Sequence, residues 1–382
     1  MAAIGGIFNV SGGSCDTAAL VRMSKATLSR GGKHGQREAA VLGDTGLFWI
    51  SEAEKNVSAR RDEIITVCDG EIYTESEMGI GAERLRAFDE SDAETCLEAY
   101  LKYGIDIGEH ISGDLALCVY DRRKKELFLI RTGNGMPPLY YGIKDSSIGF
   151  ASELGGMLAF FDSPAEVSRS TLRAHVLSRG GQYNGTDLYR DIYSVEQMSG
   201  CLCSRLGITP FKYVSFPSTP STEQRIEAFG GELVCPDEEG MSRLLRETLY
   251  AFGYPQFDCL MPSFLRDVKI SEETGRAIFD GTLCCDIGYS LERRYALCSI
   301  GGYRPVCLPP PVCTVKEKEL KKMESIMLSL FSERDKQQTA FVLGDDIENE
   351  LLRERNTALR IRYLGMALQS VIWYDTMRIT LI

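Results

Sequence analysis

The stretch "ISGDLALCVYDRRKKELFLIRTGNGMPPLYYG" (111–142) decides how the first half of this chain folds. Two apolar runs are separated by the charged segment 122–125, and glycines interrupt the chain directly afterwards. Apolar runs on either side of a short polar turn are typical of a β-hairpin. The stretch therefore predicts a hairpin over 114–135, and the next residues predict a second hairpin over 138–153.

Two earlier segments also predict strands. Residues 3–10 ("AIGGIFNV") form an apolar run without a helical stripe, which is typical of a buried strand. The segment 63–73 ("EIITVCDGEIY") predicts a strand, a turn at Asp69-Gly70 and a returning strand. Strands therefore dominate the prediction up to about residue 214.

Helices are predicted where a capping residue precedes an amphipathic pattern. Asp16 can cap a helix over about 17–29. Ser91 and Glu94, three residues apart, form the pattern of a capping box before a helix that extends to about residue 104. Together with the strands, these helices predict a mixed α+β first half.

Length, composition and charge limit the class of protein. The chain has 382 residues and is 44% hydrophobic, which favours two globular domains and excludes a disordered chain. The net charge of −11 argues against nucleic-acid binding, which needs a basic patch.

No segment reaches the roughly 20 apolar residues of a membrane span, and no signal peptide is visible. The 13 cysteines lack zinc spacings. We expect no nucleic-acid or membrane partner, no metal site, and a cytoplasmic location with reduced, buried thiols.

The composition changes after the predicted strands end. Residues 210–234 begin with a stretch rich in Pro, Ser and Thr and are predicted to be a linker. From residue 235 to 382 helical patterns alternate with short strand patterns, as in an α/β domain. The predicted domains are therefore 1–209 and 235–382.

Six segments of the first half resemble, in chain order, the class II glutamine amidotransferase domain of asparagine synthetases. They are "AAIGGIF", "LSRGGKHG", "CDGEIYTESEM", "ESDAETCLEAYLKYG", the opening stretch and "IGFASELGGMLAF". The resemblance covers residues 2 to about 205. It implies an α+β protein with an N-terminal-nucleophile (Ntn) αββα sandwich, followed by a smaller, truncated α/β domain similar to the synthetase domain of that family.

The same resemblance implies that the glutaminase chemistry is lost. Ala2 stands where the family has its cysteine nucleophile, and a methyl group cannot attack a carbonyl. Asp69 stands where the family has the asparagine that donates to the oxyanion, and an ionised carboxylate has no proton to donate. The region that carries the family's carboxylate-binding arginine has Trp49 and no arginine. We therefore identify the chain as a degenerate member that does not hydrolyse glutamine.

The family's substrate pocket matches Asp69, Gly70, Glu71 and Asp92, with Trp49 beside them. Carboxylates gathered without an arginine raise each other's pKa or recruit a cation. Our hypothesis is a pocket that rejects the α-carboxylate of free glutamine. It would be either empty or a weak site for an amine-bearing ligand such as a peptide N-terminus. The alternative is that these carboxylates point to solvent or to backbone N–H groups.

The second half resembles the synthetase domain faintly. The segment 257–268 lies where the family has a strand and a glycine-rich pyrophosphate loop, but Pro262 and Ser263 replace that loop. The segment 340–354 resembles a strand followed by an acidic loop containing Gly344, Asp345 and Asp346. These five residues form a degenerate nucleotide site in this interpretation, and the acids could equally be exposed residues that begin a helix.

Three function classes remain open at this point. The first is a non-catalytic homologue that acts as a scaffold, sensor or partner of another protein or a peptide. The second is an ATP-dependent amide-forming ligase with a dead glutaminase domain, as in the β-lactam synthetase and lasso cyclase branch, which would need ATP and Mg²⁺. The third is an asparagine synthetase proper. The sequence favours the first class and leaves the cofactor and the oligomeric state open.

Overall fold

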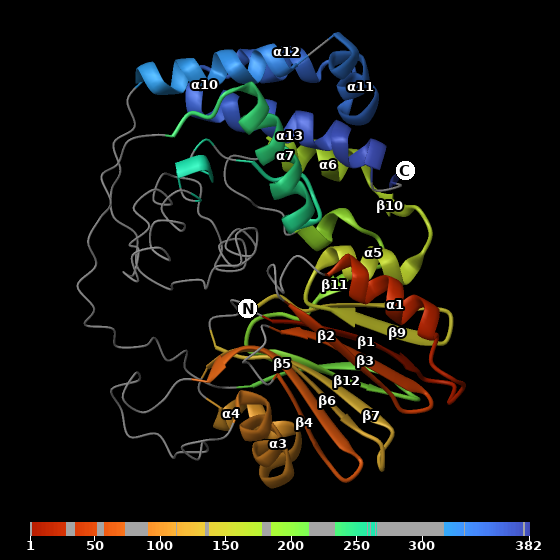
Figure 1. The fold of residues 1–382 in the computed structure, drawn as a ribbon. Helices are drawn as coiled ribbons and strands as arrows, with labels where there is room; N and C mark the ends of the chain where they lie inside the picture. Colours follow the sequence, from red (N-terminus) through yellow and green to blue (C-terminus); the bar gives the residue numbers. More distant parts are fainter. Residues whose placement is uncertain are drawn as a thin grey trace, which may run out of the picture. The chain divides into compact units, whose positions relative to one another are not determined.

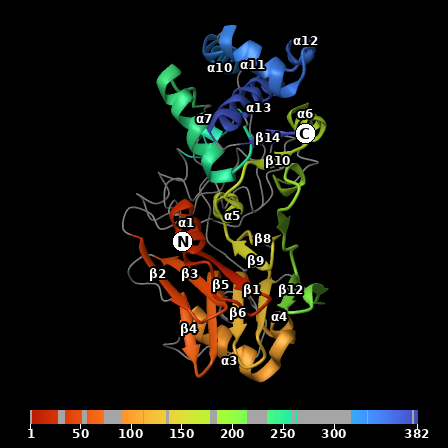
Figure 2. The same cartoon turned by 90° about the vertical axis from the view of Figure 1, so that its right-hand side faces the viewer.

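We describe the fold from a computed structural model, shown in Figures 1 and 2. The structure describes residues 2–27, 35–51, 57–72, 91–111, 113–133, 137–177, 185–213, 234–257, 259, 261–263, 265, 317–331, 333–376 and 379–382. Contacts divide the chain into two compact units, and each is described by itself. The first comprises Met1–Asp162 and Ile192–Glu223, and the second comprises Ser163–Asp191 and Gln224–Ile382.

The first unit contains two six-stranded antiparallel sheets. One has the order β11-β8-β9-β1-β3-β2 and the other has the order β13-β12-β7-β6-β5-β4. The strands of the first sheet are β1 (Ala3–Asn9), β2 (Gln36–Val41), β3 (Thr45–Ser51), β8 (Tyr140–Lys144), β9 (Ser147–Ala151) and β11 (Tyr193–Ser194). Those of the second are β4 (Ser58–Arg61), β5 (Ile64–Ile72), β6 (Gly113–Asp121), β7 (Glu126–Arg131), β12 (Ser199–Ser204) and β13 (Gly207–Lys212).

Both predicted hairpins are present. Strands β6 and β7 pair across the charged turn, and β8 pairs with β9. Side chains from both sheets, including Ile4, Phe8 and Val67, form one buried core cluster. The two sheets therefore pack face to face, and β1, predicted as a buried strand, lies inside its sheet between β9 and β3.

Helices cover the two outer faces of this pair of sheets (Figure 1). Helices α1 (Thr17–Ala26) and α5 (Leu154–Phe161) pack on the first sheet. Helix α3 (Asp92–Tyr103), followed by the short η2 (Gly104–Asp106) and α4 (Ile107–His110), covers the second. The predicted αββα layers are confirmed. The predicted capping box is also present, because Ser91 Oγ accepts from Glu94 N and Glu94 accepts from Ser91 N.

Two local predictions in the first unit are wrong. Asp69-Gly70 is not a turn, because β5 continues through both residues and pairs with β6 at Asp69↔Ala116 and Gly70↔Leu115. Pairing along the whole of β6 overrides the local turn preference of the Asp-Gly pair. The predicted linker also begins too early, since β13 extends to Lys212.

The described part of the second unit is mainly helical. Helix α13 has buried residues all round its axis rather than on a single apolar face. It packs against α7, α10 and α11 (Figure 2). The helices are α6 (Arg169–Leu177), η3 (Gly185–Leu188), α7 (Glu238–Phe252), α10 (Glu317–Leu330), α11 (Glu333–Leu343), α12 (Ile347–Arg353) and α13 (Thr357–Thr376). A parallel pair joins β10 (Ala165–Val167) to β14 (Ile379–Leu381).

The predicted α/β architecture of residues 235–382 is therefore not confirmed. In the described residues of that range, 340–343 belong to α11, although this segment was expected to be a strand, and 261–263, expected at the position of the pyrophosphate loop, are helical. A short apolar run such as "AFVL" fits a buried strand and a helix end equally well. Residues 163–191, assigned by sequence to the first domain, group with the second unit. The segment 290–310, whose sequence also resembles a helix and a strand of the family's synthetase domain, lies outside the described residues.

Candidate functional site

Ala2, which the sequence resemblance assigns to the nucleophile position, lies at the start of the first sheet. It directly precedes β1 and is 1% exposed. Its backbone N–H donates to Asp69 Oδ1 over 3.3 Å in a buried hydrogen bond. The structure thus brings Ala2 and Asp69 together, although 67 residues separate them in the sequence.

Strand alternation explains why Asp69 faces Ala2. Ile65 and Val67 of β5 belong to the core between the sheets, so Asp69, two residues further on, points to the same side. Asp69 is 1% exposed. Its carboxylate accepts a hydrogen bond from the backbone N–H of Ala2.

Gly70 is held in a conformation that suits only glycine. Its φ is +119°, and a Cβ built on it would lie 1.9 Å from the carbonyl oxygen of Asp114. The backbone of β6 therefore passes directly beside Gly70. This close approach fixes the backbone at Asp69 and Gly70, two of the predicted pocket residues.

The remaining predicted pocket residues lie on β3, α3 and β5. Trp49 lies on β3 opposite Ile4 and packs partly buried against the core between the sheets. Asp92 is the first residue of α3, and its Oδ1 accepts from Ile72 N over 3.4 Å. Glu71 lies on β5, and its side chain is outside the described set.

Cys15 is the nearest cysteine to Ala2 in the sequence and lies on the other face of the sheet. A Cβ on Gly46 would lie 2.6 Å from Cys15 Sγ and 2.8 Å from Leu20 of α1, so Cys15 is on the helix-covered side. Ala2 precedes Ile4 by two residues and faces the core between the sheets. Burial raises the pKa of the Cys15 thiol to about 11, which keeps it protonated and unreactive.

In the second unit, Ser263 is used within the chain. It is fully buried, and its Oγ accepts from Val234 N over 2.8 Å. Residues 261–263, which include Pro262, are helical. This geometry differs from a glycine-rich loop whose successive N–H groups point at a phosphate.

Asp346 is held by Arg173 of α6, a residue that the sequence analysis missed. The Arg173 guanidinium bonds both carboxylate oxygens at 2.7 and 3.0 Å and also donates to the carbonyl of Leu343. The hydrogen bonds from Arg173 lower the pKa of the Asp346 carboxyl. Gly344, with a φ of +107°, makes the turn between α11 and α12, and Asp345 follows it. No local sequence pattern relates Arg173 to Asp346, because 173 residues separate them along the chain.

Within the described ranges, no group of three His, Cys, Asp or Glu side chains could hold a metal ion. Over the same ranges, no helix is both long and apolar enough to cross a membrane.

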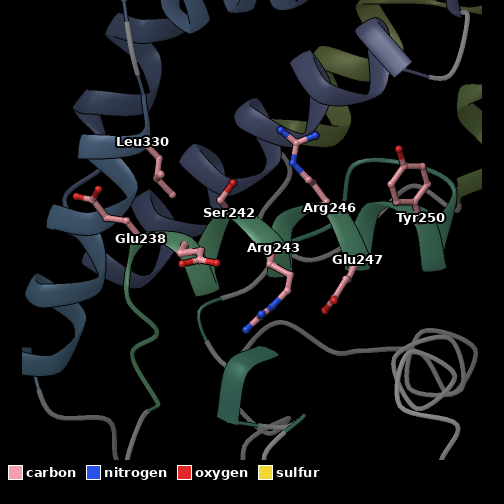
Figure 3. Close-up of a pocket in the computed structure, with 8 residues that line it drawn as sticks. Glu238, Ser242, Arg243, Arg246, Glu247, Tyr250 and Leu330 are labelled. Carbon is pink, nitrogen blue, oxygen red and sulfur yellow. The ribbon is translucent and has the colours of Figure 1, made fainter.

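An open groove lies along α7 in the second unit (Figure 3). Its volume is about 620 Å³. It mixes acidic, basic and apolar side chains, namely Glu238, Glu239, Ser242, Arg243, Arg246, Glu247, Tyr250 and Leu330. Arg243 and Arg246 point to different sides of the helix, so the two guanidinium groups do not converge on one ligand (Figure 3).

Comparison with known proteins places this geometry in context. The family described as a glutamine amidotransferase domain matches residues 1–214. Glutamine-hydrolysing asparagine synthetase 3 of Bacillus subtilis is 27% identical over 168 residues, which cover 42% of this chain and 27% of that protein. Asparagine synthetase 2 of the same organism is 27% identical over 105 residues, covering 28% and 14%. The matched stretches therefore span about a quarter or less of these relatives.

Comparison with solved structures gives a weak similarity. Glutamine phosphoribosylpyrophosphate amidotransferase from B. subtilis, in complex with ADP and GMP, has a TM-score of 0.40 at 12% identity. The similarity covers 81% of this chain and 65% of that one.

Proposed function

Because this chain belongs to the glutamine amidotransferase family, we propose that it is an asparagine-synthetase-like member whose amidotransferase domain binds without catalysing. In this proposal the domain is a scaffold or sensor for a protein or peptide partner. The single observation that carries the proposal is the buried contact between Ala2 N and Asp69 Oδ1. A methyl group occupies the position of the nucleophile, and a carboxylate occupies that of the oxyanion donor.

Both changes act on the same reaction step. Attack on the glutamine amide needs a thiolate at residue 2 and donors for the oxygen that becomes negative. Ala2 supplies no sulfur, and Asp69 places negative charge beside that oxygen. Cys15 lies on the helix-covered face of the sheet and cannot reach the reacting carbon. Restoring one group therefore leaves the other defect in place.

The first test is ammonia release from glutamine by the full chain and by Ala2→Cys. We expect no release above the blank from either protein. Loss of one oxyanion donor lowers the rate by about 10²–10³ even in an intact site. The Ala2→Cys/Asp69→Asn variant restores both groups and is the matched comparison. Ammonia release by Ala2→Cys alone would falsify the proposal.

The second test is calorimetry with L-glutamine and L-glutaminamide, which differ only in the α-carboxylate. Asp69 and Asp92 are both buried carboxylates, and Trp49 offers no charge to offset the carboxylate of glutamine. We expect glutamine to bind more weakly than glutaminamide. Micromolar binding of glutamine would contradict a pocket that rejects it.

The alternative, an ATP-dependent amide-forming ligase, predicts a measurable reaction. Such an enzyme would form an adenylate from ATP, Mg²⁺ and a carboxylate substrate. The helical conformation of residues 261–263 and the ion pair of Asp346 with Arg173 give this alternative no support. Exchange of labelled pyrophosphate into ATP by the full chain would favour the ligase over the scaffold.

A further inference from the structure

Strand β5 and helix α3 are joined at two points. Thr66 Oγ1 of β5 donates to the backbone carbonyl of Ala93 over 3.0 Å. Further along the strand, Ile72 N donates to Asp92 Oδ1 over 3.4 Å. The side chain of Thr66 thus reaches the helix backbone directly, so the strand and the helix lie close together.

Cys68 and Cys96 lie within this contact. Cys68 follows Thr66 by two residues and therefore points to the same, α3-covered face of β5. Cys96 lies one helical turn beyond Ala93 and Asp92. Both thiols are free and belong to the same buried core cluster, which includes the small side chains of Ala93 and Ala99.

The two thiols also contact each other. A hydrogen bond with Cys68 and complete burial raise the pKa of the Cys96 thiol well above its ordinary value. The Cys96 thiol is therefore protonated near neutral pH. Since the thiolate is the reactive form, oxidation of this pair is slow.

From this geometry we propose that Cys68 and Cys96 form a redox-active pair that a peroxide converts into a disulfide between β5 and α3. One thiol, as its thiolate, attacks the peroxide and becomes a sulfenic acid with release of water. The second thiol then attacks that sulfur and displaces a second water. Two thiols and one hydrogen peroxide thus give one disulfide and two waters.

This bond would act on the candidate pocket. Asp69 directly follows Cys68, and Asp92 lies one turn before Cys96. A disulfide would therefore fix the spacing of the two buried carboxylates Asp69 and Asp92. It would also link β5 covalently to α3. The inference goes beyond the proposed function and does not depend on the loss of glutaminase activity.

The chain supplies an internal control with equally buried thiols. Cys118 of β6 and Cys201 of β12 are both paired opposite Leu129 of β7, which lies between them. Two strand spacings separate their backbones by about 9.5 Å. Cα atoms more than about 7 Å apart cannot be bridged without backbone movement. Burial alone predicts the same behaviour for both pairs, whereas geometry allows only Cys68 and Cys96 to join.

Peptide mapping of the full chain tests the proposal. The protein is incubated with hydrogen peroxide for hours, alkylated and digested with trypsin. Tryptic peptides 62–84 and 87–102 each carry one cysteine, Cys68 and Cys96 respectively. We expect these two peptides to be joined and to separate after dithiothreitol. Peptides 103–122 and 191–205, which carry the control cysteines, are expected to stay unlinked.

The outcomes are distinct. Recovery of peptides 62–84 and 87–102 only as separate alkylated or over-oxidised species would overturn the proposal. Random links between several cysteine peptides would overturn it as well. Cys96→Ser is expected to leave Cys68 unlinked, and Cys96→Ala serves if the serine variant folds poorly. Because the mapping of the unmodified chain needs no variant, the proposal stays testable in either case.

Discussion

Replacing Gly70 by alanine is expected to lower the free energy of unfolding of the first unit by about 4 kcal/mol. The φ of +119° strains any residue that has a Cβ, and here the Cβ would also overlap the Asp114 carbonyl at 1.9 Å. The backbone of β6 cannot move aside without breaking its pairing with β5. Denaturant unfolding measures the loss.

Fluorescence can assign this loss to the correct unit. The chain has two tryptophans, and Trp49 lies in the first unit while Trp373 lies in the second. In a Trp373→Phe background the remaining Trp49 therefore reports unfolding of the first unit alone.

Gly207→Ala is the matched control for Gly70. Gly207 has a similar φ of +109°, but nothing lies within 4 Å of the position of its Cβ. Only backbone strain should act there, with a loss of about 1–2 kcal/mol. Equal losses at the two glycines would show that the contact with Asp114 does not determine the cost.

Replacing Gln369 by leucine is expected to destabilise the second unit by about 3 kcal/mol. Its buried carboxamide donates to Leu245 O and Thr248 Oγ1 at 3.0 and 2.8 Å. The same group accepts from Gln256 N over 2.7 Å. Leucine has a similar volume but removes the acceptor of the buried Gln256 N–H and the donor to Leu245 O and Thr248 Oγ1, although Thr248 keeps its own bond to Leu244 O. Trp373, in a Trp49→Phe background, reports the transition.

Gln338→Leu is the comparison on the surface of the same unit. The Gln338 side chain bonds Asp375 at 3.3–3.4 Å in an exposed position. Water can replace that partner, so the expected change stays within about 0.5 kcal/mol. A loss at Gln369 no larger than this would contradict the role of the buried hydrogen bonds.

Local patterns were sufficient for β1, the two hairpins and helices α1 and α3 of the first unit. Apolar runs on either side of a charged turn predicted β6 and β7, and Ser91 with Glu94 predicted the start of α3. Such signals act between residues that are close in sequence. They failed at Asp69-Gly70, because the pairing partner that keeps β5 straight is β6, more than forty residues away.

The identity of the candidate pocket residues was also available from the sequence. Ala2 and Asp69 stood at matching positions of a family pattern. The pattern gave no indication that the Asp69 carboxylate accepts from Ala2 N, or that Cys15 lies on the opposite face of the sheet. Whether the whole pocket is inactive stays a prediction for the ammonia assay.

The sequence by itself thus determined β1, the two hairpins, two helix caps and the family of the first unit, because apolar runs, turns and caps depend on neighbours along the chain. Tertiary structure alone decided which distant groups meet, as in Ala2 with Asp69, Cys68 with Cys96, and Arg173 with Asp346. It also decided that residues 340–343 are helical. The physical reason is that strand register and helix packing are set by the complete core, whose contacts join residues that no local pattern relates.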